Sequence, residues 1–349
     1  MNMYKLMQNQ TYIIAEMSAN HAGSKERAFE IIHAAKEAGA DCVKIQTYTA
    51  ETMTLDCDNN YFHIDDGTWE GETMYSLYQK AYTPWEWQAE LKEEIERLGM
   101  DFLSTPFDRS SVDFLEGIGV EAYKIASFEL TDLPLLQYVA SKGKPVILST
   151  GMAELSEIDE AVRTIQSENN HQMILLHCAS AYPAITADMN LRTMQNLQEI
   201  YQMPVGLSDH SMGSVGAVTA VALGARVIEK HLCLDRGLRT PDASFSMNPM
   251  EFKQMVQDVR QAEKALGNVT YGMKKQERTN FKFRRSIFVS KRIKKGEKIT
   301  EENTRVIRPG YGAAPKYYNE IQGQIALIDM EAGMPLELSN IGNGTLAEG

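Results

Sequence analysis

Two histidines stand at the ends of consecutive apolar runs in the second half of the sequence. His210 follows residues 204–207, and His231 follows residues 226–229. If both runs are neighbouring strands of one sheet, about 4.8 Å separates them, so the two imidazoles can converge on one metal ion. Two neutral nitrogen ligands leave positions open for water and substrate, which suits a catalytic divalent ion. Spacing alone equally allows two histidines held in ordinary hydrogen bonds.

Two lysines and several hydroxyl residues at the ends of other runs predict an anion site. Lys44 and Lys124 supply positive charge, and proteins bind phosphate with clusters of donors around such a point charge. Lys44 and Gln46 have the same strand parity, so their side chains project to one face. The alternative for a single lysine at a strand end is a side chain that binds no ligand and extends its ammonium group into water. The hydroxyl donors beside these lysines are Ser104, Thr105, Ser127, Ser149 and Ser208.

Eight short apolar runs organise the chain from Tyr12 to about Gly267. They cover residues 12–15, 41–46, 101–104, 122–125, 145–149, 173–176, 204–207 and 226–229. Helix-like segments separate nearly all of them, and this alternation predicts βαβ units with a parallel sheet. Eight such units match a (β/α)8 barrel, whose active site lies at the carboxyl ends of the strands. The alternative, an open doubly wound sheet, needs a Gly-rich turn after the first strand, where this chain has residues 16–21 instead.

We therefore predict an α/β fold: a TIM barrel over residues 1–270, a linker over 271–285 and a small, mostly β domain over 286–349. A long insertion at about residues 49–84 carries six aromatic residues. A loop of that length in a compact domain is usually functional, so it is expected to act at the site or as a lid. The alternative is a surface excursion packed on its own aromatic side chains.

Composition excludes several classes of protein. The formal net charge is −12 at pH 7, which argues against non-specific nucleic-acid binding. We find no apolar stretch of the roughly 20 residues that a membrane span needs, and we expect no secretory signal. The spacing of the four cysteines fits neither a zinc site nor a short disulfide framework. Reduced cysteines in apolar runs predict a cytoplasmic protein.

Several long motifs, in order, resemble those of the sialic acid synthase family. They occupy residues 15–21, 39–48, 123–129, 206–210 and 229–231. The resemblance spans nearly the whole chain, and its tail is similar to the antifreeze-like (SAF) domain of that family. Residues 77–87 and 106–108 are most similar to the pseudaminic acid synthases within it. The chain departs from the family at residues 177–180, at 313–315 and at Ala50, none of which touches the expected metal ligands.

The resemblance implies a transferase that joins phosphoenolpyruvate, an amino sugar and water into a sugar acid and phosphate. For the pseudaminic subgroup the sugar would be 2,4-diacetamido-2,4,6-trideoxy-L-altrose. The alternatives are a legionaminic or N-acetylneuraminic acid synthase and, more distantly, a metal-dependent barrel aldolase. A non-catalytic binding protein is a third class, which the full set of polar strand ends argues against.

The resemblance also implies roles for individual residues. His210 and His231 would bind Mn²⁺, with Mg²⁺ or Co²⁺ as alternatives, and Glu16 would reach the ion through water. Glu16, Lys44, Lys124 and Glu129 would be the catalytic residues. The tail would cross over in a homodimer, so that Arg308, or the nearby Arg305, enters the partner's site. The remaining residues implied to bind phosphoenolpyruvate or the sugar are Gln46, Thr105, Ser127, Ser149, Ser180, Tyr182, Ser208 and Asp242.

Overall fold

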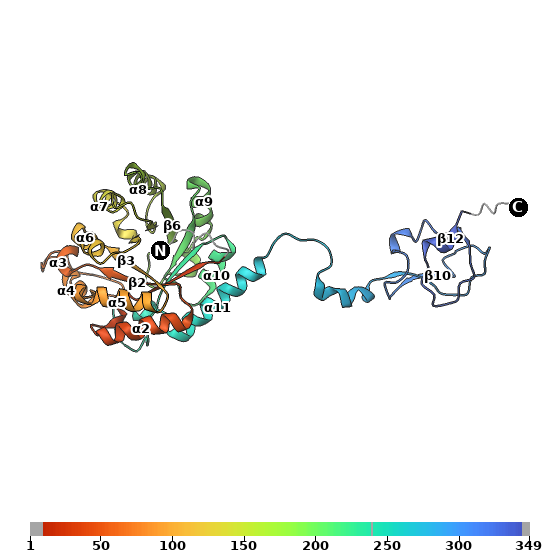
Figure 1. Ribbon diagram of the computed structural model, residues 1–349, viewed down its shortest axis with the longest axis horizontal. Helices are drawn as coiled ribbons and strands as arrows, with labels where there is room; N and C mark the ends of the chain where they lie inside the picture. Colours follow the sequence, from red (N-terminus) through yellow and green to blue (C-terminus); the bar gives the residue numbers. More distant parts are fainter. Residues whose placement is uncertain (1–9, 239, 344–349) are drawn as a thin grey trace. The chain divides into compact units, whose positions relative to one another are not determined.

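The chain divides after Gly267 into two compact units (Figure 1). A computed structural model describes residues 10–238 and 240–343. The first unit is the α/β barrel, and the second, which begins at Asn268, is small and built mainly of short strands and turns. The division comes slightly before the predicted boundary at residue 270.

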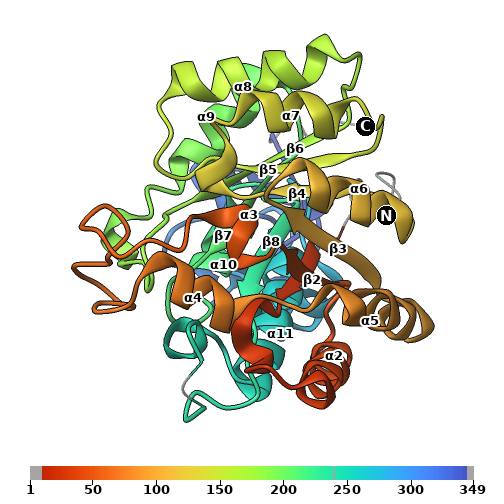
Figure 2. The ribbon, with the colours of Figure 1, turned by 90° about the vertical axis from the view of Figure 1, so that its left-hand side faces the viewer.

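Eight parallel strands form the wall of the first unit. Their order is β3-β2-β1-β8-β7-β6-β5-β4, and β3 and β4, at the two ends of this order, are in contact. The sheet is therefore a nearly closed barrel, which confirms the predicted fold class (Figure 2). The strands are β1 (Tyr12–Glu16), β2 (Cys42–Thr47), β3 (Asp101–Pro106), β4 (Tyr123–Ile125), β5 (Val146–Ser149), β6 (Met173–Cys178), β7 (Val205–Asp209) and β8 (Val227–His231).

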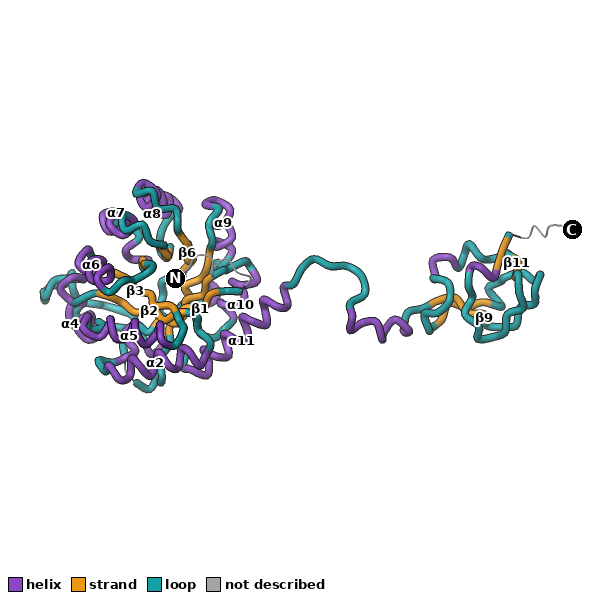
Figure 3. Tube along the Cα trace, viewed as in Figure 1, coloured by secondary structure: helices purple, strands orange, loops and turns teal. Residues whose placement is uncertain are grey.

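Helices cover the outside of this wall (Figure 3). The first one shows how the sequence sets its ends: the Ser24 hydroxyl caps it by accepting from Arg27 N–H, and Gly39 ends it in the left-handed region. The covering helices are α2 (Lys25–Ala38), α5 (Trp85–Arg97), α6 (Arg109–Gly117), α7 (Leu133–Ala140), α8 (Leu155–Ser167), α9 (Arg192–Tyr201), α10 (Val215–Ala222) and α11 (Pro249–Leu266). Single 3-10 turns follow several strands: η1 (Ser18–His21), η2 (Ser127–Glu129), η3 (Thr186–Asp188) and η4 (Ala243–Phe245).

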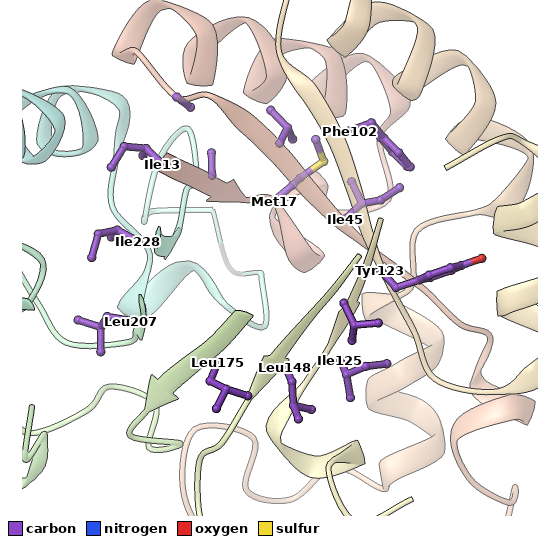
Figure 4. Close-up of a cluster of buried hydrophobic side chains, with 14 of the residues drawn as sticks. Ile13, Met17, Ile45, Phe102, Tyr123, Ile125, Leu148, Leu175, Leu207 and Ile228 are labelled. Atoms are coloured by element: carbon purple, nitrogen blue, oxygen red, sulfur yellow. The ribbon is translucent and has the colours of Figure 1, made fainter. Parts of the chain in front are cut away.

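The core of the barrel unit has two layers because alternate residues of each strand face opposite sides. The larger layer lies between strands and helices, and includes Ile13, Leu207 and Ile228 (Figure 4). The smaller layer consists of residues with the opposite parity, which face the interior of the barrel. We call it the plug, and it consists of Tyr12, Ile14, Cys42, Leu103, Ala122, Ile147, Ile174, Leu176 and Val227.

The insertion between β2 and α5 is partly helical, so the prediction of a loop was incomplete. It contains α3 (Ala50–Met53) and α4 (Met74–Ala81), and the Thr73 hydroxyl caps α4 by accepting from Ser76 N–H. Two hydrogen bonds fasten its middle to the barrel. The Thr68 hydroxyl donates to the carbonyl of Tyr182 (2.7 Å), and the Trp69 indole N–H donates to the carbonyl of Pro241 (2.9 Å).

The second unit has its own core. Its strands are β9 (Ser286–Val289), β10 (Thr304–Ile307), β11 (Ile325–Ala326) and β12 (Ile341–Gly342), which pair as β9–β10 and β11–β12. Two further 3-10 turns are η6 (Pro315–Tyr317) and η7 (Leu338–Asn340). Ile287, Ile299 and Leu336 are among its fully buried residues. The segment predicted to be a linker is a 3-10 helix, η5 (Lys275–Phe283). Within the described part of the chain, no helix has the length and apolarity to cross a membrane.

Candidate active site

Four buried charged side chains lie at the carboxyl ends of the barrel strands, above the plug. Lys44 Nζ is 2.5 Å from Glu16 Oε2 and 3.5 Å from Glu229 Oε1. Lys124 Nζ approaches the same Glu229 oxygen at 3.4 Å. Their side chains are at most 5 % exposed. We call these four residues, Glu16, Lys44, Lys124 and Glu229, the charged floor.

Each residue of the charged floor has a shifted pKa, through burial and through its charged neighbours. Burial raises the pKa of Glu16 to about 7, although Lys44 acts in the opposite direction. Burial also favours the neutral form of Glu229, but the two lysines outweigh it and lower the pKa of that carboxyl. For Lys44, burial is outweighed by Glu16 and Glu229, so its pKa rises, whereas burial lowers the pKa of Lys124. Lys124 is therefore the lysine whose charge the protein compensates least, and an incoming anion would stabilise it most.

Hydroxyl groups lie beside the charged floor. Thr105 Oγ1 lies 3.4 Å from Lys44 Nζ, and Ser208 Oγ lies 3.3 Å from Glu229 Oε1. The Ser149 hydroxyl is buried without a hydrogen-bond partner among the described residues. Buried polar atoms in native proteins are nearly always paired, so this free donor marks a place for a ligand.

Gly151 brings two more hydroxyls together. Its N–H donates to Ser127 Oγ at 3.1 Å. A Cβ atom at Gly151 would lie 2.1 Å from Ser180 Oγ and 2.8 Å from Ser127 Oγ, so any larger residue would displace these hydroxyls. Ser104, by contrast, was wrongly predicted to join the anion site. Its hydroxyl lies 2.6 Å from Thr47 Oγ1 and donates to the carbonyl of Ile45, on the helix side of β3.

His210 and His231 lie side by side, with 5.3 Å between their ring centroids. Nδ1 of His231 is buried and has no partner among the described residues. Burial lowers the pKa of His231 well below its usual value, so this imidazole is neutral and has a lone pair to offer. His210 Nδ1 instead contacts Cys178 Sγ (3.6 Å) and the carbonyl of Ala179 (3.3 Å), which leaves Nε2 as its ligand atom.

These two histidines fit a divalent ion, but they are not a complete protein cage. Among residues 10–238 and 240–343, no group of three or more His, Cys, Asp or Glu side chains is arranged to hold a metal. An ion at this place would take its other ligands from water and substrate, which is the open coordination that catalytic ions have.

A cavity of about 440 Å³ opens above the charged floor. Its barrel side is polar, with Gln46, Glu129, His231 and Asp242. Burial of the carboxyl group raises the pKa of Glu129 to about 7, and burial also raises the pKa of Asp242. The opposite side comes from the insertion and is apolar. We call it the roof, and it consists of Met53, Ile64, Trp69, Met74, Leu77 and Tyr78.

The turn η1 connects the polar side of the cavity to the rest of the barrel. The Ala19 N–H donates to Asp242 Oδ2 (3.4 Å). Asn20 is buried and donates to the carbonyl of Leu232 (3.0 Å) and to Ser246 Oγ (2.9 Å), which fixes the loop that carries Asp242. This loop and the insertion meet at Pro241, the acceptor for Trp69, which joins the two sides of the cavity.

The structure brings nearly all the predicted site residues to one end of the barrel. Glu16, Lys44, Lys124 and Thr105 lie in or beside the charged floor, and Gln46, Glu129, Tyr182, His231 and Asp242 line the cavity. Tyr182 also lies beside the metal-site histidines, with its ring 4.4 Å from that of His210. Arg308 belongs to the second unit, where it follows β10, and its role stays a prediction.

Sequence reasoning missed two residues of the site. Glu229 has the same strand parity as His231, and that signal was available in the run that ends at His231. Gly151 comes two residues after the predicted donor Ser149, but nothing in the sequence shows that two hydroxyls from other loops converge on it.

Comparison with known proteins agrees with this arrangement. The model of the NeuB family matches residues 31–271, and that of the SAF domain matches residues 284–341. A pseudaminic acid synthase from Campylobacter jejuni is 45% identical over 94% of this chain and 96% of its own length. An N,N'-diacetyllegionaminic acid synthase from Legionella pneumophila is 39% identical over 93% of each protein.

A solved structure shows the same fold. The N-acetylneuraminic acid synthetase of Leptospira borgpetersenii, crystallised with citrate, is 34% identical, covers 78% of this chain and 90% of its own, and superposes with a TM-score of 0.69. The family resemblance of the motifs is thereby confirmed: the chain belongs to the NeuB family and carries a C-terminal SAF domain.

Proposed function

We propose that this protein is a pseudaminic acid synthase, which condenses phosphoenolpyruvate with 2,4-diacetamido-2,4,6-trideoxy-L-altrose and water to give pseudaminic acid and phosphate. The observation that carries the proposal is the 45% identity with the Campylobacter jejuni pseudaminic acid synthase over almost the full length of both chains. Identity with the legionaminic acid synthase is lower, at 39%.

The two-sided cavity supports the choice of sugar. A 6-deoxy-diacetamido sugar presents a methyl group and a second acetamido methyl where N-acetylmannosamine presents hydroxyls. The roof offers apolar surface to these methyl groups, with Trp69 and Tyr78 as its aromatic residues and Phe107 and Phe128 beside them. A buried methyl contributes roughly 1 kcal/mol, and an unpaired buried hydroxyl costs roughly 1–3 kcal/mol. The expected preference is roughly 10- to 1,000-fold in specificity constant.

Not every aromatic residue of this region takes part. Tyr75, Tyr82, Trp85 and Trp87 do not line the cavity. Trp85 instead packs against Phe114, with 4.7 Å between ring centroids.

The residues of the site divide the chemistry between them. Phosphoenolpyruvate carries two anionic groups, for which Lys44 and Lys124 supply charge and the hydroxyls of Thr105, Ser127 and Ser149 supply donors. In the reaction, carbon three of phosphoenolpyruvate attacks the aldehyde carbon of the sugar, water adds to carbon two, and the carbon–oxygen bond to phosphate breaks. The hydroxyl donors stabilise the departing phosphate because they are already oriented toward it.

Two carboxyls supply and accept protons. With pKa values of about 7, Glu16 and Glu129 hold or release a proton near neutral pH. A pKa near the working pH suits a general acid or base. The protonated form of Glu129 can donate to the sugar's aldehyde oxygen, and an ionised carboxylate can take a proton from the attacking water.

A divalent ion, Mn²⁺ foremost, would be held by Nε2 of His210 and Nδ1 of His231. When bound, it supplies the Lewis acidity that polarises an aldehyde oxygen. Nδ1 of His231, which has no hydrogen-bond partner among the residues that the structure describes, supports this assignment. Chelation should abolish turnover and Mn²⁺ should restore it. Full activity of a chelated His210→Ala protein would contradict the assignment.

Phosphate release with a panel of sugars tests the substrate. The 6-deoxy-diacetamido altrose, its legionaminic-type isomer and N-acetylmannosamine are compared at equal phosphoenolpyruvate and Mn²⁺. The altrose should have the highest specificity constant. Equal or better turnover of N-acetylmannosamine would overturn the assigned sugar, and absence of phosphate release with all three would overturn the synthase function.

We further propose a homodimer in which the second unit of one chain completes the partner's site. This unit carries 14 Lys and Arg against 9 Asp and Glu, although the whole chain has a net charge of −12, so it can contribute positive charge such as Arg308 to an anionic substrate. Mixed dimers of Arg308→Ala and His231→Ala chains should regain activity. No rescue would argue that the tail acts on its own barrel. We place the enzyme in the cytoplasm, where the buried free thiols Cys42, Cys178 and Cys233 stay reduced.

A further inference from the structure

Two buried ionic residues directly precede the two histidines along their strands. Asp209 is the last residue of β7, before His210, and Lys230 comes before His231 at the end of β8. Asp209 and Lys230 are direct partners in the β7–β8 ladder. Because alternate residues face opposite sides of a strand, the histidines face the barrel interior while Asp209 and Lys230 face the surrounding helices.

The two ionic residues form a tight and fully enclosed pair. Lys230 Nζ is 2.8 Å from Asp209 Oδ2, and the two side chains are 1 % and 0 % exposed. The ammonium group also donates to the carbonyls of Ser211 and Gly213. Asp209 Oδ1 accepts from the Ser211 N–H (2.9 Å) and the Ser211 hydroxyl (2.6 Å). The pair therefore fixes both the strand ends and the turn that begins immediately after His210.

Stability alone does not account for this pair. Removing two charges from water costs about as much as their attraction returns, and a hydrophobic pair of similar size is often as stable or more stable. The layer around the pair is apolar, with Leu207 and Ile228 facing the same side. A buried ion pair differs from apolar contacts in that it has a single geometry, so it gives specificity of arrangement.

The packing around the pair leaves it little freedom. Helix α10 approaches so closely at Gly216 that a Cβ atom there would lie 3.0 Å from both Asp209 Oδ2 and Ser211 Oγ. The backbone carbonyls of the two histidines are also fixed by hydrogen bonds. His210 accepts from Ala184 N–H at 3.0 Å, and His231 accepts from Met247 N–H at 2.9 Å.

We infer that the Asp209–Lys230 ion pair positions His210 and His231 for a divalent metal ion. The pair holds the two strand ends in register, and the register sets the separation of the imidazoles, 5.3 Å between ring centroids. Asp209 and Lys230 touch neither the ion nor the substrate, so they are positioning residues. The inference rests on the metal-binding part of the proposed function.

Binding of Mn²⁺ to the purified full-length protein, without substrate, tests the inference. Free Mn²⁺ is measured by electron paramagnetic resonance during a titration. The double variant Asp209→Asn/Lys230→Met replaces the pair with neutral side chains of similar size. Its Kd for Mn²⁺ should rise about 10- to 100-fold, the range seen when residues that orient metal ligands are replaced. Circular dichroism and the thermal unfolding midpoint establish that the variant is folded.

A control removes another, partly exposed ion pair of the same unit. Arg260 Nη2 lies 3.2 Å from Asp41 Oδ2, where α11 meets the residue before β2, at the opposite end of the strands from the histidines. The variant Asp41→Asn/Arg260→Met should keep the wild-type Kd for Mn²⁺. A rise as large as that of the first double variant would overturn the inference, because any lost ion pair would then have the same effect.

If the double variant does not fold, the single variant Asp209→Asn tests the inference. In Asp209→Asn the amide oxygen can still accept from Ser211, and Lys230 keeps its two carbonyl acceptors, so the loss of affinity should be several-fold. A wild-type Kd in the folded double variant, or in Asp209→Asn if only that one folds, would overturn the positioning role and leave the metal site intact. A wild-type protein that binds no Mn²⁺ would overturn both the metal site and this inference.

Discussion

The plug and the charged floor share the same strands and differ completely in chemistry. On β1 the inward residues are Tyr12 and Ile14 in the plug and then Glu16 in the floor. On β5 they are Ile147 and then Ser149, and on β8 Val227 and then Glu229. Two residues, one step of the strand period, separate an apolar layer from a polar one.

The two layers also differ in how well their polar atoms are satisfied. Several buried side-chain atoms that have no hydrogen-bond partner within the described part of the chain lie at or next to the floor: Glu129 Oε2, Ser149 Oγ, Glu229 Oε2 and His231 Nδ1. An unsatisfied buried polar atom costs roughly 1–3 kcal/mol, so a layer with several of them is poor for stability. The plug has few polar atoms to satisfy and fills the barrel. Stability and chemistry are thus assigned to different heights of one barrel.

The largest expected effect is on activity when a floor residue is changed. Lys124→Met removes the ammonium group nearest Glu229 and keeps a side chain of similar length. Loss of a fixed donor to a reacting group costs about 10²–10³-fold in kcat, and the lost charge adds to this. Phosphate release should fall by at least that factor.

Lys253→Met on the exposed face of α11 is the matched control and should keep wild-type turnover. The free energy of unfolding of Lys124→Met should change little, because one buried charge is removed while Glu229 keeps Lys44 as its partner. Wild-type kcat in a folded Lys124→Met protein would show that the floor does not carry the chemistry.

A substitution in the plug should lower stability and leave activity nearly unchanged. Ile147 is fully buried, and Ile147→Ala should lower the free energy of unfolding of the barrel by about 2–5 kcal/mol. Urea unfolding followed by tryptophan fluorescence measures this, because all three tryptophans lie in the barrel unit. The kcat at a low, non-denaturing temperature should remain within a few-fold of wild type.

The same substitution in the second unit serves as the comparison. Ile287→Ala removes an equally buried isoleucine from the other core and should leave the fluorescence-detected transition unchanged. If Ile147→Ala instead lowered kcat as much as Lys124→Met, the separation of the two layers would be wrong.

The sequence located the end of the barrel that carries the site. It did not show which residues of each strand face the barrel interior. Runs of apolar residues located all eight strands, and the polar residues after them located the site. The phase of the alternation was the weak point. In β3 the sequence Asp-Phe-Leu-Ser has no alternating pattern, so Ser104 and Thr105 were both taken as donors, although consecutive residues must face opposite sides.

The roof was predictable only as a functional region. The contact of Trp69 with Pro241 joins residues 172 positions apart, and that of Thr68 with Tyr182 joins residues 114 apart. Such pairings depend on how the barrel closes, which no local pattern reports. The same limit applies to Gly151, whose role is set by two hydroxyls from other loops.

A third, smaller effect concerns the pH dependence of stability. The pKa of Glu129 is raised from 4.5 to about 7 because its carboxyl is buried, although other atoms of the residue are partly exposed. The folded protein therefore keeps a proton that the unfolded chain releases. This contribution to stability is fully present below about pH 4.5 and is lost as the pH rises through about 7.

Glu129→Gln should remove that dependence. Between pH 4.5 and 8, the free energy of unfolding of the wild type should fall by up to about 3 kcal/mol relative to the variant. Glu160→Gln on the exposed surface of α8 should follow the wild type at every pH. If the free energies of unfolding of wild type and Glu129→Gln change in parallel with pH in metal-free buffer, burial does not keep the Glu129 carboxyl neutral.

The smallest effect is expected at the roof, which is apolar like the plug but faces the cavity instead of other core residues. Trp69→Phe keeps an aromatic ring and removes the N–H that donates to Pro241. A net hydrogen bond contributes about 1 kcal/mol, so the ratio of specificity constants for the 6-deoxy-diacetamido sugar over N-acetylmannosamine should fall about five- to tenfold.

Trp85→Phe loses an equivalent bond to the carbonyl of Tyr48 (3.0 Å), but its ring does not line the cavity, so the ratio should change less. Each variant should lose a similar amount of stability, about 1 kcal/mol, for its missing hydrogen bond. A ratio that moves equally in both, or only in Trp85→Phe, would mean that the roof does not select the sugar and that its apolar surface serves packing, as the plug does.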